Sequence, residues 1–126
     1  MPLVRITLRR GKSSAHLAAL RNGVYQAMRE TFNVPENDRF ILIGQHDADE
    51  FDYDPGYLGI ARSDDLVIVQ ITCNTGRTVE MKQALYRGIA DNLAADPGLR
   101  PEDVFINLVE TSKENWSFGN GIAQYA

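Results

Sequence analysis

The feature that most constrains the fold of this chain is an internal repeat, which aligns residues 6–41 with residues 71–106 without a gap. The match covers an apolar segment, a glycine turn, an amphipathic segment and a second apolar segment. The matched pairs are Ile6 with Ile71, Thr7 with Thr72, Gly11 with Gly76, Lys12 with Arg77, Ser13 with Thr78, Ala19 with Ala84, Leu20 with Leu85, Gly23 with Gly88, Val24 with Ile89, Asp38 with Asp103, Phe40 with Phe105 and Ile41 with Ile106. A repeat of this kind indicates one supersecondary unit used twice.

The pattern of the first copy predicts a strand, a helix and a second strand. Leu3–Leu8 is an apolar run of strand length, and Ser13 or Ser14 can cap the helix that follows. Asn33 is suited to the end of that helix, and Arg39–Gln45 is a second run rich in Ile and Phe. One helical stripe is formed by Leu17, Leu20, Val24 and Met28.

The second copy repeats this order with strands at Leu66–Thr72 and Val104–Val109 and a helix capped by Thr78. Its helical stripe comprises Met81, Leu85, Ile89 and Leu93. We therefore predict an α+β fold, a tandem β-α-β repeat with two helices packed on a mainly four-stranded sheet. A single domain is expected, with copies at about residues 2–46 and 66–110, a connecting loop at 47–65 and a tail at 111–126.

Composition and charge exclude several classes of function. The 126 residues are 44% hydrophobic and carry a net charge of −4. No basic block extends beyond Arg9, Arg10 and Lys12, so a nucleic-acid partner is not expected. No apolar run approaches the ~20 residues of a membrane span, and the start does not resemble a cleavable leader.

The reactive side chains do not form a metal-binding pattern. Cys73 is the single cysteine, and the two histidines, His16 and His46, do not cluster with it in the sequence. The acidic segment between Asp47 and Asp54 lacks the glycine that a calcium loop requires, and a solvated loop is expected there. These observations predict a cytoplasmic protein that needs no metal or other cofactor.

The start of the chain supplies a candidate catalytic group. Pro2 follows Met1, and a small second residue favours removal of the initiator, which leaves proline with a free secondary amine. A free α-amino group titrates near ~8, and burial among apolar groups lowers the pKa of an amine. Such an amine can act as an acid, a base or a nucleophile toward carbonyl groups. Alternatively, Pro2 is only a tolerated first residue of a strand.

The predicted topology brings two further polar groups toward Pro2. Parallel strands within a β-α-β unit place Asp38, before the second strand, near the start of the first strand. If the two copies pair about a pseudo-twofold axis, the loop that carries Arg77 reaches the same edge. Asp38 could instead only end a loop. Arg77 could be a surface charge near the helix start or, with Gly76 and Thr78, could hold an anion there.

The chain resembles the tautomerase superfamily, whose members use an amino-terminal proline, and within it the malonate semialdehyde decarboxylases. The resemblance extends over essentially the whole chain. It is carried by Pro2-Leu-Val, the duplicated unit, Arg77, Phe32-Asn-Val-Pro-Glu36 with Asp38-Arg39, Leu58-Gly-Ile-Ala-Arg62, Trp116-Ser-Phe-Gly119, Gly121 and Ala123-Gln124.

The resemblance implies a small-molecule enzyme and assigns its site. Pro2 and Asp38 match the catalytic proline and aspartate, and Arg77 matches the second of two arginines. Asn74 stands where the first arginine is expected, beside an inserted residue, and is a candidate substrate ligand. The apolar wall of the pocket is assigned to Trp116, Phe118 and Tyr125.

The resemblance also implies decarboxylation of a small carboxylic oxo acid by a homotrimer. Pro2 would either polarise the carbonyl or form an iminium ion with it. Keto-enol tautomerisation or hydration in the same pocket is the main alternative. A trimeric binding protein without catalysis is a further one.

Overall fold

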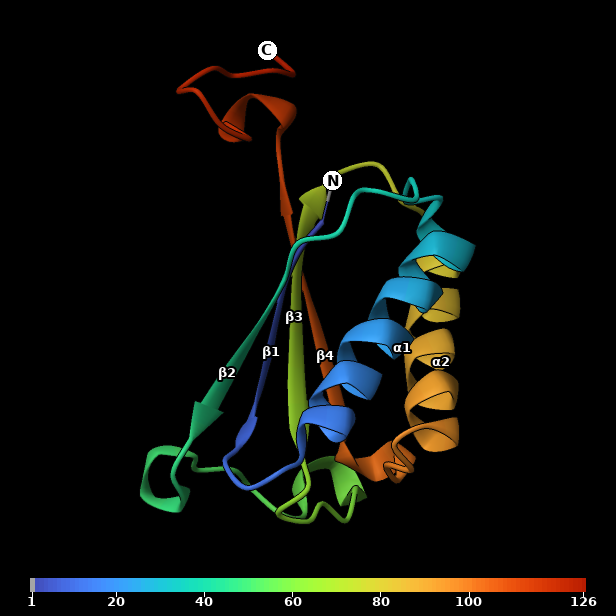
Figure 1. Ribbon diagram of the computed structural model, residues 1–126. Helices are drawn as coiled ribbons and strands as arrows, with labels where there is room; N and C mark the ends of the chain where they lie inside the picture. Colours follow the sequence, from blue (N-terminus) through green and yellow to red (C-terminus); the bar gives the residue numbers. More distant parts are fainter. Residues whose placement is uncertain (1) are drawn as a thin grey trace.

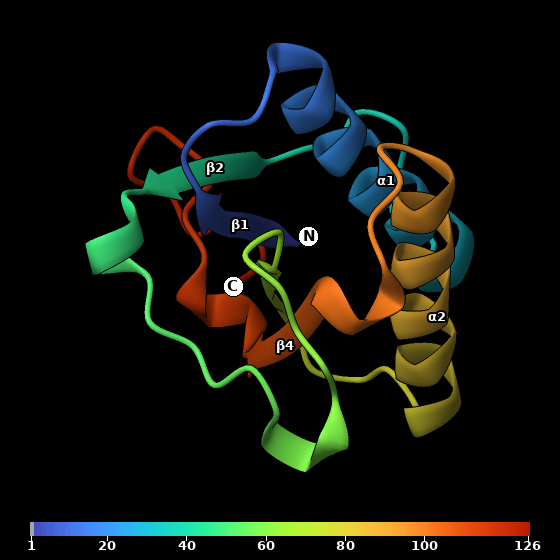
Figure 2. The same ribbon diagram turned by 90° about the horizontal axis from the view of Figure 1, so that it is seen from below.

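The computed structural model describes residues 2–126, and Met1, whose removal the sequence predicts, lies outside the described residues. Four strands form one sheet: β1 (Leu3–Arg9), β2 (Ile41–His46), β3 (Val67–Asn74) and β4 (Val104–Thr111). Two long helices, α1 (Ser14–Phe32) and α2 (Val79–Ala95), lie on the same side of the sheet (Figures 1 and 2). The predicted α+β fold with two helices on a four-stranded sheet is therefore confirmed.

The sheet has the order β2-β1-β3-β4, and its registers repeat between the two halves. Val4 pairs with Ile41 in the parallel β1–β2 ladder, and the equivalent residues Val69 and Ile106 pair in the parallel β3–β4 ladder. The central strands β1 and β3 are antiparallel, as the pseudo-twofold arrangement requires. Equivalent ends of the two copies consequently lie at opposite ends of the sheet.

The turns that follow β1 and β3 also share an unusual backbone conformation. Gly11 has φ of +125° and Gly76 has φ of +124°, values at which a residue with a side chain would be strained. Ser13 and Thr78 then cap the two helices, because their hydroxyl oxygens accept hydrogen bonds from the amides of His16 and Met81. The equivalent glycines and helix caps thus give the β1–α1 and β3–α2 connections the same backbone conformation.

The core lies between the helices and one face of the sheet. Alternate strand residues, such as Val4, Ile6 and Leu8 of β1, are buried there against the apolar stripes of the helices. A Cβ built on Gly23 would lie 2.7 Å from Cδ2 of Leu93, and one on Gly88 would lie 3.4 Å from Cβ of Ala27. The two equivalent glycines therefore permit the close contact of α1 with α2.

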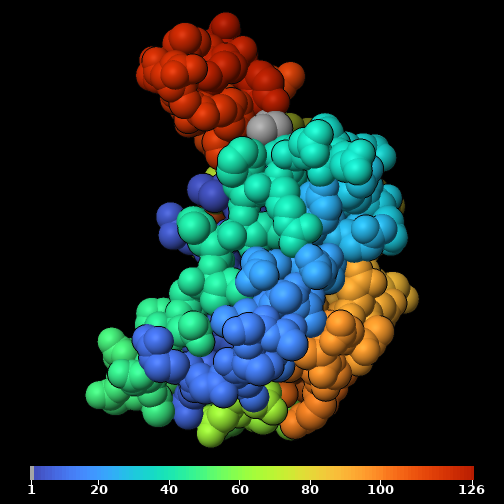
Figure 3. Space-filling view, viewed as in Figure 1, coloured from blue at the N-terminus to red at the C-terminus, as the bar shows by residue number. Residues whose placement is uncertain are grey.

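The other face of the sheet is not covered by helices. Large apolar side chains of β2 and β4, together with Phe40 directly before β2, remain 40% or more exposed there: Phe40, Leu42, Phe105 and Val109. The tail after β4 extends beyond the end of the sheet and stands out from the rest of the molecule (Figure 3). Neither helix in the described part of the chain is long and apolar enough to cross a membrane.

Candidate active site

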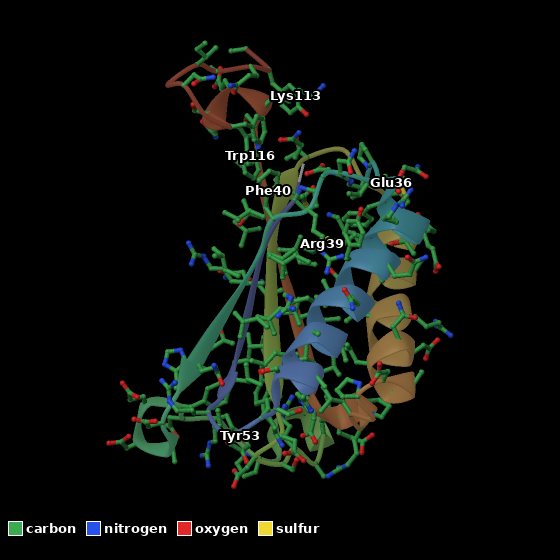
Figure 4. All side chains as sticks on the ribbon, in the orientation of Figure 1. Glu36, Arg39, Phe40, Tyr53, Lys113 and Trp116 are labelled. Carbon is green, nitrogen blue, oxygen red and sulfur yellow. The ribbon has the colours of Figure 1, made fainter. Side chains whose placement is uncertain are left out.

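A cavity of about 440 Å³ lies between the start of the chain and the tail. Pro2, which is buried, lines this cavity from the start of β1. Phe40 reaches the cavity because its carbonyl oxygen accepts a 2.9 Å hydrogen bond from the amide of Val4, which fixes the segment before β2 beside β1. In Figure 4, Phe40 and Trp116 lie at the same end of the sheet. The full lining comprises Pro2, Leu3, Phe40, Asn115, Trp116, Ser117 and Phe118.

Aromatic side chains of the tail form one wall of this cavity. The rings of Trp116 and Phe118 are stacked, with centroids 5.4 Å apart and planes inclined by 14°. The ring of Tyr125 meets Phe118 edge-on at 5.1 Å, although Tyr125 is not among the residues that line the cavity. Tyr125 therefore contacts the wall through Phe118 without lining the cavity, whereas Trp116 and Phe118 line it.

Asp38 lies in a turn between α1 and β2, where its side chain is only 7% exposed. The turn is closed by the amide of Asp38, which donates a 3.1 Å hydrogen bond to the carbonyl oxygen of Pro35. Burial raises the pKa of the Asp38 carboxyl above its ordinary value, and the positive charge of Arg77 opposes this rise. The structure thus brings Asp38 within electrostatic reach of Arg77.

Arg77 follows Gly76 and is half-buried beside the end of α1. Its guanidinium lies over the ring of Phe32, 4.7 Å from the centroid, and its Nη1 donates a 3.1 Å hydrogen bond to the carbonyl oxygen of Asn74. Arg77 and Asp38 do not line the cavity that Pro2 and Trp116 share. A guanidinium has five N–H donors, however, and the bond to Asn74 uses one of them.

Asn74 ends β3 and contacts the tail. Its Oδ1 accepts a 2.7 Å hydrogen bond from Nε1 of Trp116. The contact of Asn74 with substrate stays a prediction. What the structure shows is that the Asn74 side chain is hydrogen-bonded to Trp116 in the wall of the cavity. The sequence offered no direct signal for this pairing, because the two residues are 42 positions apart.

Sequence reasoning also missed four residues of the cavity lining. Leu3 and Phe40 could have been found from the parallel pairing of β1 with β2, which was expected. Asn115 and Ser117 flank Trp116 and enter the cavity with it. Their placement depends on the path of the tail, which no sequence pattern defines.

The exposed acidic loop contains a cluster of three carboxylates. Asp47, Asp49 and Glu50 have carboxylate oxygens within 4.8 Å of one another. Asp47 accepts a 3.1 Å hydrogen bond from Nε of Arg10, and its amide donates to Glu50 at 3.0 Å. These contacts connect Asp47 to Arg10 and to Glu50 within the loop.

Comparison with known proteins gives consistent results over the length of the chain. The tautomerase family profiles, both described as tautomerase enzyme, match residues 38–119 and 2–57. The probable tautomerase YusQ of Bacillus subtilis (strain 168) is 48% identical over 98% of both chains. The probable tautomerase YrdN of the same organism is 32% identical over 99% of this chain and 96% of its own length.

Solved structures give the same result at the level of the fold. Malonate semialdehyde decarboxylase, studied for its decarboxylase and hydratase activities, superposes with a TM-score of 0.91 at 33% identity, covering 98% of this chain and 95% of that one. A malonate semialdehyde decarboxylase inhibited by 3-bromopropiolate also gives 0.91, at 36% identity and 98% and 93% coverage. This chain therefore belongs to the tautomerase superfamily of enzymes, in the group that resembles malonate semialdehyde decarboxylase.

Proposed function

We propose that this chain, after removal of Met1, is a metal-independent decarboxylase of a small 3-oxo acid such as malonate semialdehyde. The observation that carries the proposal is the position of Pro2, which lines an apolar cavity opposite Trp116 and Phe118. A secondary amine in such a cavity is suited to carbonyl chemistry. The similarity to two malonate semialdehyde decarboxylases over nearly the whole chain supports the choice of substrate.

In the proposed reaction, Pro2 supplies the electron sink. Its protonated amine polarises the aldehyde carbonyl, or its nitrogen condenses with that carbonyl to give an iminium ion and water. The electron pair of the breaking carbon–carbon bond then moves into the carbonyl or iminium group, and carbon dioxide leaves. Protonation at carbon gives acetaldehyde directly, or after hydrolysis of the enamine-derived iminium.

The other candidate residues have supporting roles in this proposal. Arg77 holds the substrate carboxylate through its remaining N–H donors. Asp38 orients the substrate, or activates water when the same site hydrates an unsaturated acid. The aromatic wall of Trp116, Phe118 and Tyr125 keeps water from the carboxylate that is lost, which favours the dispersed charge of the transition state.

A second candidate function, keto-enol tautomerisation, is favoured by the size of the cavity. A volume of about 440 Å³ lies within the range of roughly 300–1,000 Å³ that proteins use for drug-sized ligands, and exceeds what a three-carbon acid needs. An aryl group would fill the space between Phe40 and Trp116. The names of YusQ and YrdN, both probable tautomerases, support this alternative. Pro2 would then carry the proton between the enol oxygen and carbon.

We also propose that the active form is a homotrimer. The uncovered sheet face with its exposed Phe40, Leu42, Phe105 and Val109 would be buried between copies. A structural neighbour, fused 4-OT, has been solved as a symmetric trimer; it is 23% identical, has a TM-score of 0.78 and covers 95% of this chain and 94% of its own. Leu42→Glu should give a monomer in sedimentation experiments, because it places a charge on this face.

The two reactions can be separated by one comparison. We expect kcat/KM for malonate semialdehyde to exceed that for ketonisation of phenylenolpyruvate, with both activities lost in Pro2→Ala. The reverse order would assign the site to tautomerisation.

Covalent labelling offers an independent check: 3-bromopropiolate, which inhibits a relative, should modify the peptide that begins at Pro2. Labelling elsewhere, with Pro2 unmodified, would contradict the assignment.

A further inference from the structure

Asn74 contacts both the aromatic wall and the arginine of the candidate active site. Its side-chain Oδ1 accepts from Trp116 at 2.7 Å, and its backbone oxygen accepts from Arg77 at 3.1 Å. We propose that Asn74 is a positioning residue, which fixes the indole of Trp116 as the wall of the cavity opposite Pro2. This inference rests on the proposed function, because it concerns how the same cavity is built.

The chemistry of the indole determines how the side chain of Asn74 is oriented. An indole nitrogen is only a donor, so the amide oxygen must face it and the amide nitrogen must point elsewhere. The hydrogen bond uses the single polar group of Trp116. The ring of Trp116 therefore offers the substrate only carbon, which is what an apolar wall requires.

The tail depends on a small number of contacts for its position. The amide of Thr75 donates a 3.1 Å hydrogen bond to the carbonyl oxygen of Thr111, and Nδ2 of Asn115 donates to Oγ1 of Thr111 at 2.6 Å. Both contacts hold the base of the tail, which then stands away from the sheet (Figure 3). The bond from Trp116 to Asn74 links the aromatic wall itself to β3.

Loss of this bond would be transmitted along the wall. Phe118 is stacked on Trp116, and Tyr125 packs on Phe118. A movement of Trp116 would therefore displace all three rings. Trp116 and Phe118 both line the cavity that contains Pro2. Asn74 therefore controls the orientation of a substrate without contacting the reacting atoms.

The other half of the molecule provides independent support. Arg9 ends β1 as Asn74 ends β3, and it also holds the aromatic residues of the segment that follows the second strand of its copy. Its Nη2 donates to the carbonyl oxygen of Phe51 at 3.5 Å, and its guanidinium lies 5.6 Å from the ring centroid of Tyr53. Phe51 and Tyr53 lie 65 positions before Trp116 and Phe118, which is the offset of the repeat. In both copies, the last residue of the first strand thus contacts the segment that follows the second strand.

The test uses Trp116 as its own reporter, since it is the single tryptophan of the chain. We expect Asn74→Leu, which keeps side-chain volume but removes the acceptor, to shift Trp116 emission to the red and to raise its quenching by acrylamide about twofold. The kcat for malonate semialdehyde should fall about fivefold, as for loss of one hydrogen bond, with KM changed less than about twofold. Asn74→Asp retains an acceptor and should restore the emission and much of kcat, while its charge raises KM for an anionic acid.

Asn22→Leu is the matched control. Asn22 also accepts a side-chain hydrogen bond, 2.6 Å from Nη2 of Arg39, but Arg39 keeps its contact with the ring of Tyr25 in its absence. This variant should leave emission and kcat at the wild-type values. An unchanged Trp116 signal in folded Asn74→Leu overturns the proposal, and so does a changed signal with unchanged kcat. If the wild type acts on no oxo acid, the proposed function fails, and the Trp116 signal alone then decides whether Asn74 fixes the wall.

Discussion

The two ends of the sheet contain equivalent residues of the repeat that serve different purposes. At one end lie Pro2, Asp38 and Arg77; at the other, the equivalent positions are Val67, Asp103 and Lys12. The second end also has a cavity, of about 210 Å³. Three residues that line it, Ile68, Phe105 and Tyr53, occupy the positions that correspond to Leu3, Phe40 and Phe118 in the lining of the first cavity. Figure 4 shows Tyr53 at the end of the sheet opposite Trp116.

The two ends differ in the chemical surroundings of these three equivalent positions. Val67 is internal to the chain, so it offers no amine, and its side chain is fully buried in the core. Asp103 is 1% exposed and accepts two 2.7 Å hydrogen bonds, from the amide and the hydroxyl of Ser63. Lys12 forms an ion pair with Asp65. On the proposed function, this duplicated unit uses one copy of the site for chemistry, whereas the equivalent residues of the other copy stabilise the fold.

The largest expected effect distinguishes Pro2 from Val67. Pro2→Ala should lower kcat/KM for malonate semialdehyde about a thousandfold, because a positioned acid–base group contributes up to about four orders of magnitude. Its free energy of unfolding should change little. Val67→Ala should instead cost about 2 kcal/mol of stability with kcat preserved, since two buried methyl groups are removed. Steady-state kinetics and denaturant unfolding measure both variants.

Substitution by Asn should change the stability of the protein in opposite directions at Asp38 and at Asp103. Asp103→Asn turns an N–H group toward the Ser63 donors and should destabilise the fold by about 1–3 kcal/mol. Asp38→Asn should lower kcat about a hundredfold but raise stability at neutral pH, because burial makes the charged carboxyl costly. A loss of stability in Asp38→Asn would contradict this account of its environment.

The pH dependence of the Asp38 effect follows from its raised pKa. Above about 4, the ordinary value for Asp, the unfolded chain releases a proton that the folded protein still holds. The folded state then binds more protons, so stability falls as pH rises from that value to the folded-state pKa. Asp38→Asn should lack this loss. The difference in stability between the two proteins should vanish below about pH 4 and be full above the folded-state pKa.

Arg77 and Lys12 give a smaller contrast. Arg77→Met should raise KM about thirtyfold for anionic substrates, as for loss of a charge-assisted hydrogen bond, whereas kcat should change less. Lys12→Met removes a partly exposed ion pair and should alter KM and stability little. If the two substitutions changed KM equally, the assignment of Arg77 to substrate binding would be wrong.

The smallest expected contrast is the difference in stability loss between substitutions at the two glycines of the helix contact. Gly23→Ala should destabilise the protein by about 1–3 kcal/mol, because the new Cβ lies 2.7 Å from Cδ2 of Leu93. Gly88→Ala meets Ala27 at 3.4 Å, and the better helix propensity of alanine offsets part of the cost. Thermal unfolding of both variants measures this asymmetry, and equal losses would show that the Leu93 side chain adjusts freely.

The repeat made most of the fold predictable from the sequence. Matching glycines, caps and apolar stripes defined both β-α-β units, and the pseudo-twofold pairing of β1 with β3 followed from them. The position of the tail has no counterpart in the repeat pattern, because its contacts are single long-range ones such as Trp116 with Asn74. The same applies to Arg77, whose stacking on Phe32 depends on where α1 ends.

The central claim is that the amine of Pro2 performs the chemistry. Its most direct test is the rate of acetaldehyde release from malonate semialdehyde, measured for protein shown by intact mass to lack Met1 and for the Pro2→Ala variant. We predict rapid release by the processed protein and a loss of about a thousandfold in the variant. Equal rates for the two proteins, both folded and both lacking Met1, would contradict the claim.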